Sequence, residues 1–172
     1  MTETPQQYTK RILSYVAGRK PLAVQAATPK KLARMIAPLT RAQLCRRPGP
    51  GKWSIREILS HLAEAELVGG YRLRMILSTN RTPIQAYDQN VWAKNSNYAA
   101  WDPREAIELF STLRAANLKL MKSLSRAQWK KYGIHAERGK ETVLRVAQMY
   151  AGHDINHLEQ MRRIAAEARR KK

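Results

Sequence analysis

Residues 53–78 read WSIREILSHLAEAELVGGYRLRMILS, and this stretch decides the fold because it joins a strong helix start to a long helical repeat. Ser54 is suited to cap a helix N-terminus, and Glu57 stands at the return position of a capping box. Trp53 can pack on Ile58 across this start. Apolar residues then recur at helical spacing, as Ile58, Leu62, Ala65, Val68, Leu73 and Leu77. We therefore predict a helix from the Ser54 cap to about Ser78.

Two helix starts precede this stretch. Residues 4–7 (TPQQ) combine a capping threonine, a proline at the first helical position and a glutamine at the return position. They predict a first long helix that runs to about Ala17, where Gly18 can take the left-handed conformation that ends helices. Residues 28–29 (TP) predict a shorter helical piece that ends near Pro38.

Two further long helices follow, and strand signals are almost absent. Residues 102–105 (DPRE) repeat the capping pattern and begin a third long helix, which extends through Met121. A fourth runs from about Glu141 through Ile164. Two short pieces with similar capping residues are predicted as single helical turns, at 40–44 and 125–129.

Four substantial amphipathic helices without strands predict an all-α four-helix bundle. The length of 172 residues suits one domain, 1–172. Residues 80–102 separate the second and third helices, whereas a tight connection needs only ~2–8 residues. This segment is rich in aromatic residues for a solvated loop, with Tyr87, Trp92, Tyr98 and Trp101. We predict that it crosses the end of the bundle, is partly helical and packs down as a lid.

The chain is strongly basic, with 32 Lys and Arg against 13 Asp and Glu and a formal net charge of +19. Such a field attracts polyanions, so nucleic acid is one candidate partner. The positive residues are nevertheless spread along the chain, and no helix-turn-helix, zinc finger or similar nucleic-acid motif is present. A non-enzymatic basic bundle that binds nucleic acid is therefore the alternative to an enzyme.

Cysteine usage and hydropathy indicate the compartment. Cys45 is the single cysteine, which excludes an intrachain disulfide and fits a reducing environment. We expect its thiol to be buried and inert. The N-terminal residues 1–10 lack an apolar signal core, and no stretch approaches the ~20 apolar residues that cross a bilayer. These features predict a cytoplasmic protein with no membrane partner.

Three of the four histidines form a candidate metal site. His153 and His157 are four residues apart, so both side chains project from one face of the fourth helix. His61 lies on the second helix, one turn beyond the core position Ile58. The three imidazoles can make a site with one open position, as catalytic metals need, although a buried histidine can also simply hydrogen-bond in a core. His135 lies in a polar loop, and we expect it at the surface or at a helix entry.

Residues 52–62 (KWSIREILSHL) and 152–160 (GHDINHLEQ) together resemble the DinB-like superfamily, and the resemblance covers nearly the whole chain. It implies an up-down-down-up bundle with a nickel, zinc or similar divalent ion on a histidine triad. That triad maps onto His61, His153 and His157. Some relatives are thiol S-transferases or isomerases that use low-molecular-weight thiols, others are called metal-dependent hydrolases, and many have no known activity. One departure is Glu64, where the early motif often has Asp.

An open three-histidine site permits two chemistries, and the ligands alone do not choose between them. A bound water ionises near pH ~7, whereas a bound thiol is held as a nucleophilic thiolate. Gln160 and Asn156 are candidates to orient an imidazole from outside the ligand set. A zincin, with Asp154 in the role of the usual glutamate, is disfavoured because no third ligand follows on that segment.

We therefore predict a divalent-metal-binding protein with transferase or hydrolase activity on a small molecule, and a homodimer. Catalytic residues beyond the metal ligands are not assigned. The remaining alternative is a bundle whose metal ion is purely structural.

Overall fold

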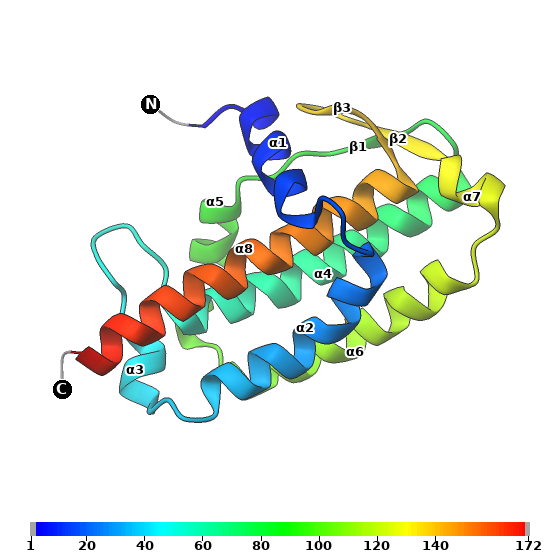
Figure 1. The fold of residues 1–172 in the computed structure, drawn as a ribbon. Coiled ribbons are helices and arrows are strands. Elements are labelled where there is room, and N and C mark those ends of the chain that lie inside the picture. The colour runs from blue at the N-terminus through cyan, green and yellow to red at the C-terminus, as the bar shows by residue number, and fades with distance from the viewer. Residues whose placement is uncertain (1–2, 171–172) are drawn as a thin grey trace.

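The computed structural model describes residues 3–170 and is mostly helical (Figure 1). Its elements in chain order are α1 (Pro5–Val16), α2 (Pro21–Ile36), α3 (Arg41–Cys45), α4 (Ile55–Ser78), β1 (Thr82–Ile84), α5 (Gln89–Asn95), the 3-10 turn η1 (Tyr98–Ala100), α6 (Pro103–Lys122), α7 (Arg126–Lys130), β2 (Tyr132–His135), β3 (Gly139–Thr142) and α8 (Val143–Arg170). None of the described helices has the length and apolar character that crossing a membrane requires.

Helices α2, α4, α6 and α8 form the four-helix bundle. Each of α4 and α2 packs against both α6 and α8. Helices α4 and α6 run in the same direction, and α2 and α8 run in the opposite one (Figure 1). The predicted up-down-down-up bundle is therefore confirmed, and the segment between α4 and α6 returns the chain to the end where α4 began.

The first bundle helix differs from the prediction. Helix α1 begins and ends where expected, but it lies outside the bundle, across α8 (Figure 1). The bundle position is taken by α2, which begins at Pro21 rather than at residues 28–29 and contains Pro29 in its interior. Pro29 has no N–H for the carbonyl of Gln25, and this oxygen accepts instead from Arg114 Nη1 on α6 at 2.9 Å. The missing helical hydrogen bond is thus replaced by a tertiary one.

The capping residues predicted most of the other helix boundaries correctly. Ser54 caps α4, and its side chain and that of Glu57 form the complete capping box. The two predicted single turns are α3 and α7, each with its own capping box. The crossover segment is partly helical and packed down, as predicted, and Tyr98 within it is buried.

A small three-stranded sheet was missed. Strand β1 pairs in parallel with β2, and β2 pairs antiparallel with β3. Because Glu141 and Thr142 belong to β3, α8 begins at Val143 rather than at Glu141. Each strand has only three or four residues, too few for an alternating pattern to stand out in the sequence.

The core consists of two apolar clusters with a buried polar network beside them. Arg114 is the centre of this polar network and is almost fully buried. Its guanidinium donates to Asp154 of α8 at 2.5 and 3.0 Å, and to Glu66 of α4 at 2.8 Å. Asn117 adds a bond to Glu66 Oε1 at 2.8 Å. These contacts join three bundle helices by charge as well as by apolar packing.

Replacement of Gly152 by alanine should destabilise the fold. A Cβ at this position would lie well inside van der Waals contact with the backbone carbonyl oxygen of Ile12, so α1 must shift away from α8. We expect the Gly152→Ala protein to lose ~1–3 kcal/mol of unfolding free energy in urea titrations, despite the better helix propensity of alanine. Gly49→Ala is the control, because no atom lies within 4 Å of the added Cβ. Equal stability of the two variants would refute the close approach of α1.

Candidate metal centre

The three predicted histidines meet at the seam between α4 and α8. His61 Nε2 lies 3.0 Å from His153 Nε2, and His157 Nε2 lies 3.1 Å from the same atom. The three ligand nitrogens all lie within 4.8 Å of one another. Nitrogens that share one ion at ~2.0–2.1 Å stand ~3 Å apart, and two of the three nitrogen pairs here have this spacing, so the three side chains form a group that could hold a single divalent ion.

The orientation of α8 explains why its histidines face this seam. Successive residues on an α-helix are ~100° apart around the axis. Asp154 points into the bundle and binds Arg114, so the neighbouring His153 is turned toward α4. His157, one turn later, lies on the same face. The ion pair also removes Asp154 from the histidines, which rules out the zincin arrangement.

Burial keeps the three imidazoles neutral. It lowers the pKa of His157 to about 4 and the pKa values of His61 and His153 well below their usual range. For His153 the neighbouring His157 acts in the same direction. A neutral imidazole has the free lone pair that a metal ligand needs.

Gln160 and Asn156 have different surroundings. His157 Nδ1–H donates to Gln160 Oε1 at 2.9 Å, which leaves Nε2 as the acceptor that faces the other two histidines. Asn156 has a different partner, because its Oδ1 accepts from Arg11 of α1 at 2.9 Å. Of the two residues predicted to orient an imidazole, the structure places only Gln160 against one.

Aromatic residues cover one side of the histidine cluster. The ring of Trp53 lies 4.9 Å from that of His61, and Tyr98 of the crossover lies 6.5 Å from it. The Tyr98 hydroxyl donates to Glu64 at 2.6 Å. Glu64 therefore supports the crossover, and Glu66 belongs to the network of Arg114.

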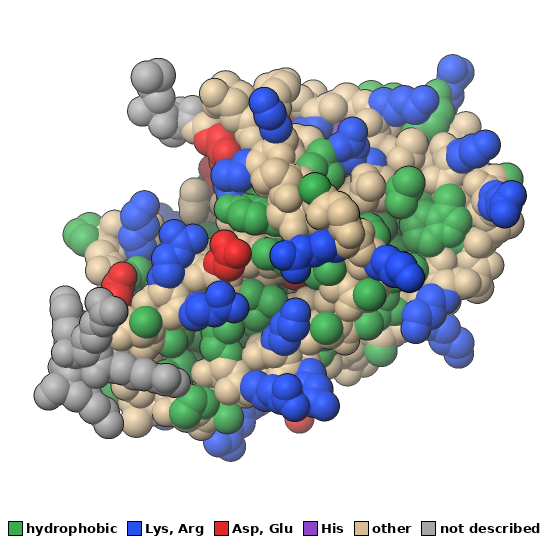
Figure 2. Space-filling model, in the orientation of Figure 1, with side chains coloured by type: hydrophobic (Ala, Val, Ile, Leu, Met, Phe, Trp, Pro, Cys, Tyr) green, Lys and Arg blue, Asp and Glu red, His purple; other side chains and the backbone are tan. Residues whose placement is uncertain are grey.

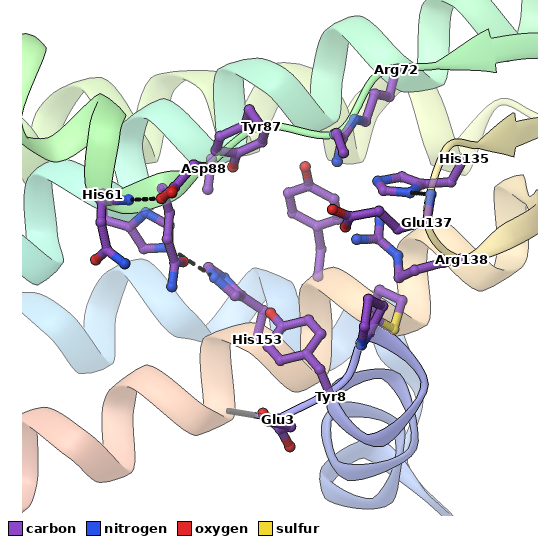
Figure 3. Close-up of a pocket in the computed structure, with 17 residues that line it drawn as sticks. Glu3, Tyr8, His61, Arg72, Tyr87, Asp88, His135, Glu137, Arg138 and His153 are labelled. Atoms are coloured by element: carbon purple, nitrogen blue, oxygen red, sulfur yellow. Dashed lines mark hydrogen bonds between the residues drawn. The ribbon is translucent and has the colours of Figure 1, made fainter. Parts of the chain in front are cut away.

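A cavity of about 490 Å³ opens beside His61 and His153 (Figure 3). Its walls come from elements outside the bundle as well as from α4 and α8. Tyr8 belongs to α1, Tyr87 and Asp88 to the crossover, and Arg138 to the turn between β2 and β3. Two of the three clustered histidines, His61 and His153, thus lie at the wall of this cavity, whereas His157 lines a separate, smaller cavity.

His135 lines the same cavity, and the prediction that it lies at the surface was wrong. It is the last residue of β2 and is 2% exposed. Burial lowers its pKa to about 4, and the nearby Arg138 contributes. The sequence around His135 resembles a polar loop. The residue is buried because its strand pairs with β1, which lies far away in the sequence. Cys45 also differs from its prediction, since it is partly exposed and lines another groove.

A model of the DinB superfamily matches residues 26–161, which include all three clustered histidines. The chain belongs to the DinB superfamily. Among DinB-type relatives, YfiT of Bacillus subtilis is 24% identical over 146 residues, 83% of this chain and 82% of that protein. A relative from Bacillus licheniformis is 28% identical over 131 residues, 76% of this chain and 74% of that one. Both carry provisional names as metal-dependent hydrolases.

A solved structure of YfiT has the same fold. It superposes with a TM-score of 0.80 at 20% identity and covers 96% of this DinB chain and 90% of that one. It is described as a probable metal-dependent hydrolase with an unusual four-helix bundle topology. At this identity the likeness establishes the architecture of the bundle.

The contact of Gln160 with His157 generates a prediction about metal affinity. Gln160→Ala removes the acceptor that fixes the ring, and we expect the affinity for Zn²⁺ or Ni²⁺ to fall ~10–100-fold in competition titrations with a chelating indicator. Asn156→Ala is the matched control, because it removes an amide from the same turn of α8 without losing an imidazole contact. Equal affinities for the two variants would contradict the orienting role.

The buried histidines also predict how stability depends on pH. The folded-state pKa of His135, about 4, lies below the ~6.5 of an unfolded chain, so unfolding takes up a proton between these values. This contribution to stability is present above pH ~6.5 and is lost as the pH falls toward 4. In urea titrations of chelator-treated protein, His135→Phe should therefore reduce the slope of unfolding free energy near pH 5 by ~1 kcal/mol per pH unit. An unchanged slope would show that His135 is protonated in the fold.

Proposed function

We propose that this DinB protein is a divalent-metal-dependent hydrolase that holds its ion on His61, His153 and His157. The observation that carries the proposal is the convergence of three neutral imidazole nitrogens, with two of the three histidines at the wall of an open cavity. The provisional hydrolase names of its relatives support the same reaction class.

The residues around the proposed ion have different roles in a hydrolase. The chemistry that such an ion supplies when bound is Lewis acidity, which polarises a carbonyl and lowers the pKa of water. Gln160 fixes the ring of His157 through Nδ1. Trp53 and Tyr98 cover His61 on one side, and a second cavity reaches His157 and Gln160. The cavity beside His61 and His153 is large enough for a small organic substrate.

The site is less suited to a purely structural ion. Structural zinc sites almost always have four protein ligands. Among the described residues, the group that could hold an ion consists of the three histidines alone.

A thiol S-transferase would use the same ligands to hold a thiolate. Cys45 lines a different groove, so such a thiol would come from a free cofactor.

The distribution of charge on the face drawn in Figure 2 supports a small-molecule enzyme over a nucleic-acid-binding bundle. Figure 2 shows Lys and Arg side chains spread over this face, singly and in small groups, with apolar and neutral surface between them. A protein that follows a phosphate backbone usually gathers its positive side chains into a patch or stripe.

Metal content tests the ligand assignment. Untagged wild-type protein should contain about one divalent ion per chain by plasma mass spectrometry, whereas His61→Ala and His153→Ala should contain almost none because two imidazoles hold an ion far less tightly. His135→Ala is the matched control, since it removes a histidine from the same cavity but not from the cluster. Equal metal content in all four proteins would exclude the site.

Activity then separates hydrolysis from thiol transfer. Metal-loaded protein is assayed with a panel of carboxylic esters and amides, with and without added low-molecular-weight thiols. Turnover without thiol that disappears in His153→Ala supports the hydrolase. Turnover of electrophiles only in the presence of a thiol would replace it with a transferase.

A further inference from the structure

The end of the cavity away from the histidine cluster contains a buried hydrogen-bond donor without a partner. His135 Nδ1 accepts the backbone N–H of Glu137 at 3.2 Å. The neutral ring therefore carries its proton on Nε2. This Nε2 is buried and has no hydrogen-bond partner among the described residues. An unpaired buried donor is costly, and here it faces the cavity (Figure 3).

Arg72 brings a positive charge to the same end. Its guanidinium donates to the carbonyl of Gln85 at 2.7 Å and lies over the ring of Tyr87. Arg72 takes part in none of the ion pairs formed by the described residues, whereas Arg138 is bound by the carboxylate of Glu141. The Arg72 side chain and the His135 ring point toward a common space (Figure 3).

We propose that Arg72 and His135 bind a free carboxylate of the substrate, at the opposite end of the cavity from the histidine cluster. This inference rests on the proposed function and narrows it to esters or amides of molecules that carry a second, unreacting carboxylate. The two groups supply one charged and one neutral donor, which match the two oxygens of a carboxylate.

A singly charged group suits this end better than a phosphate. Glu137 and Asp88 also line the cavity. A phosphate monoester carries ~1.5–2 negative charges at neutral pH and would be repelled more strongly by these two side chains. The Asp88 carboxylate is held in place, because it caps α5 by accepting from the N–H groups of Asn90 and Val91.

The wall between the two ends indicates the shape of the substrate. His61 and Arg72 are eleven residues apart on α4, which is ~16 Å along the helix axis. Tyr150 lies between them, and its ring packs on the backbone of Gly69, where any Cβ would collide with it. Tyr8 and Tyr87 complete an aromatic lining. The substrate is therefore an extended molecule with a flat or aromatic middle.

Binding of a matched acid and amide tests the proposal without any turnover. Phenylacetate and phenylacetamide have nearly the same shape and differ in charge. Isothermal titration of chelator-treated wild-type protein should show about tenfold or tighter binding of phenylacetate. Arg72→Met and His135→Phe should each remove most of this preference. Arg145→Met, which removes an exposed arginine elsewhere on α8, should leave it unchanged.

The outcomes separate this inference from the metal site. His153→Ala should keep the preference for phenylacetate, since its imidazole belongs to the other end of the cavity. Loss of metal binding in that variant with retained acid selectivity would support both ideas. Equal affinity for acid and amide in wild type, no binding of either at millimolar concentration, or full selectivity in folded Arg72→Met and His135→Phe would overturn the carboxylate site and leave the metal assignment standing.

Discussion

The arrangement of the bundle depends on the hydrogen bonds and ion pairs of the buried Arg114 guanidinium. It reaches Asp154 on α8, Glu66 on α4 and the backbone carbonyl of Gln25 on α2. A charge left unpaired at this depth costs several kcal/mol, so the helices pack in the one arrangement that brings these groups together. Both carboxylates, in turn, raise the pKa of Arg114 against the effect of its burial. The rotation of α8 about its axis, and with it the direction of His153, follows from this contact.

The bundle and its additions have separate roles. Helices α4 and α8 supply the imidazoles, and they belong to the rigid frame. The elements outside the frame, namely α1, the crossover and the strand hairpin, form much of the cavity wall. Metal ligands on helices and substrate contacts on connecting segments are a common division in enzymes, because a frame holds geometry while loops vary. The far end of the cavity combines both parts, because His135 belongs to β2 and Arg72 to the bundle helix α4.

Sequence reasoning succeeded where the physics is local. The Ser54 cap and the spacing of His153 and His157 each depend on residues within one turn, and both appear in the structure as predicted. It failed where a distant partner changes the local rule. In the sequence Pro29 resembles a helix start, but it lies inside α2 because Arg114 replaces the missing hydrogen bond. His135 resembles a loop residue, but it is buried because its strand pairs with β1. The pairing of Asp154 with Arg114 could not be read from either segment alone.

The order in which these pieces are made adds a consequence for the living cell. Chains emerge from the ribosome from the N-terminus onward, and α8 follows every other described element. A nascent chain that stops at residue 142 has the complete set of non-bundle walls but only one of the three clustered imidazoles. On the proposed assignment, three imidazoles can hold an ion only after α8 has packed against α4. Synthesis of α8 thus precedes assembly of the proposed site, whichever ion the site holds.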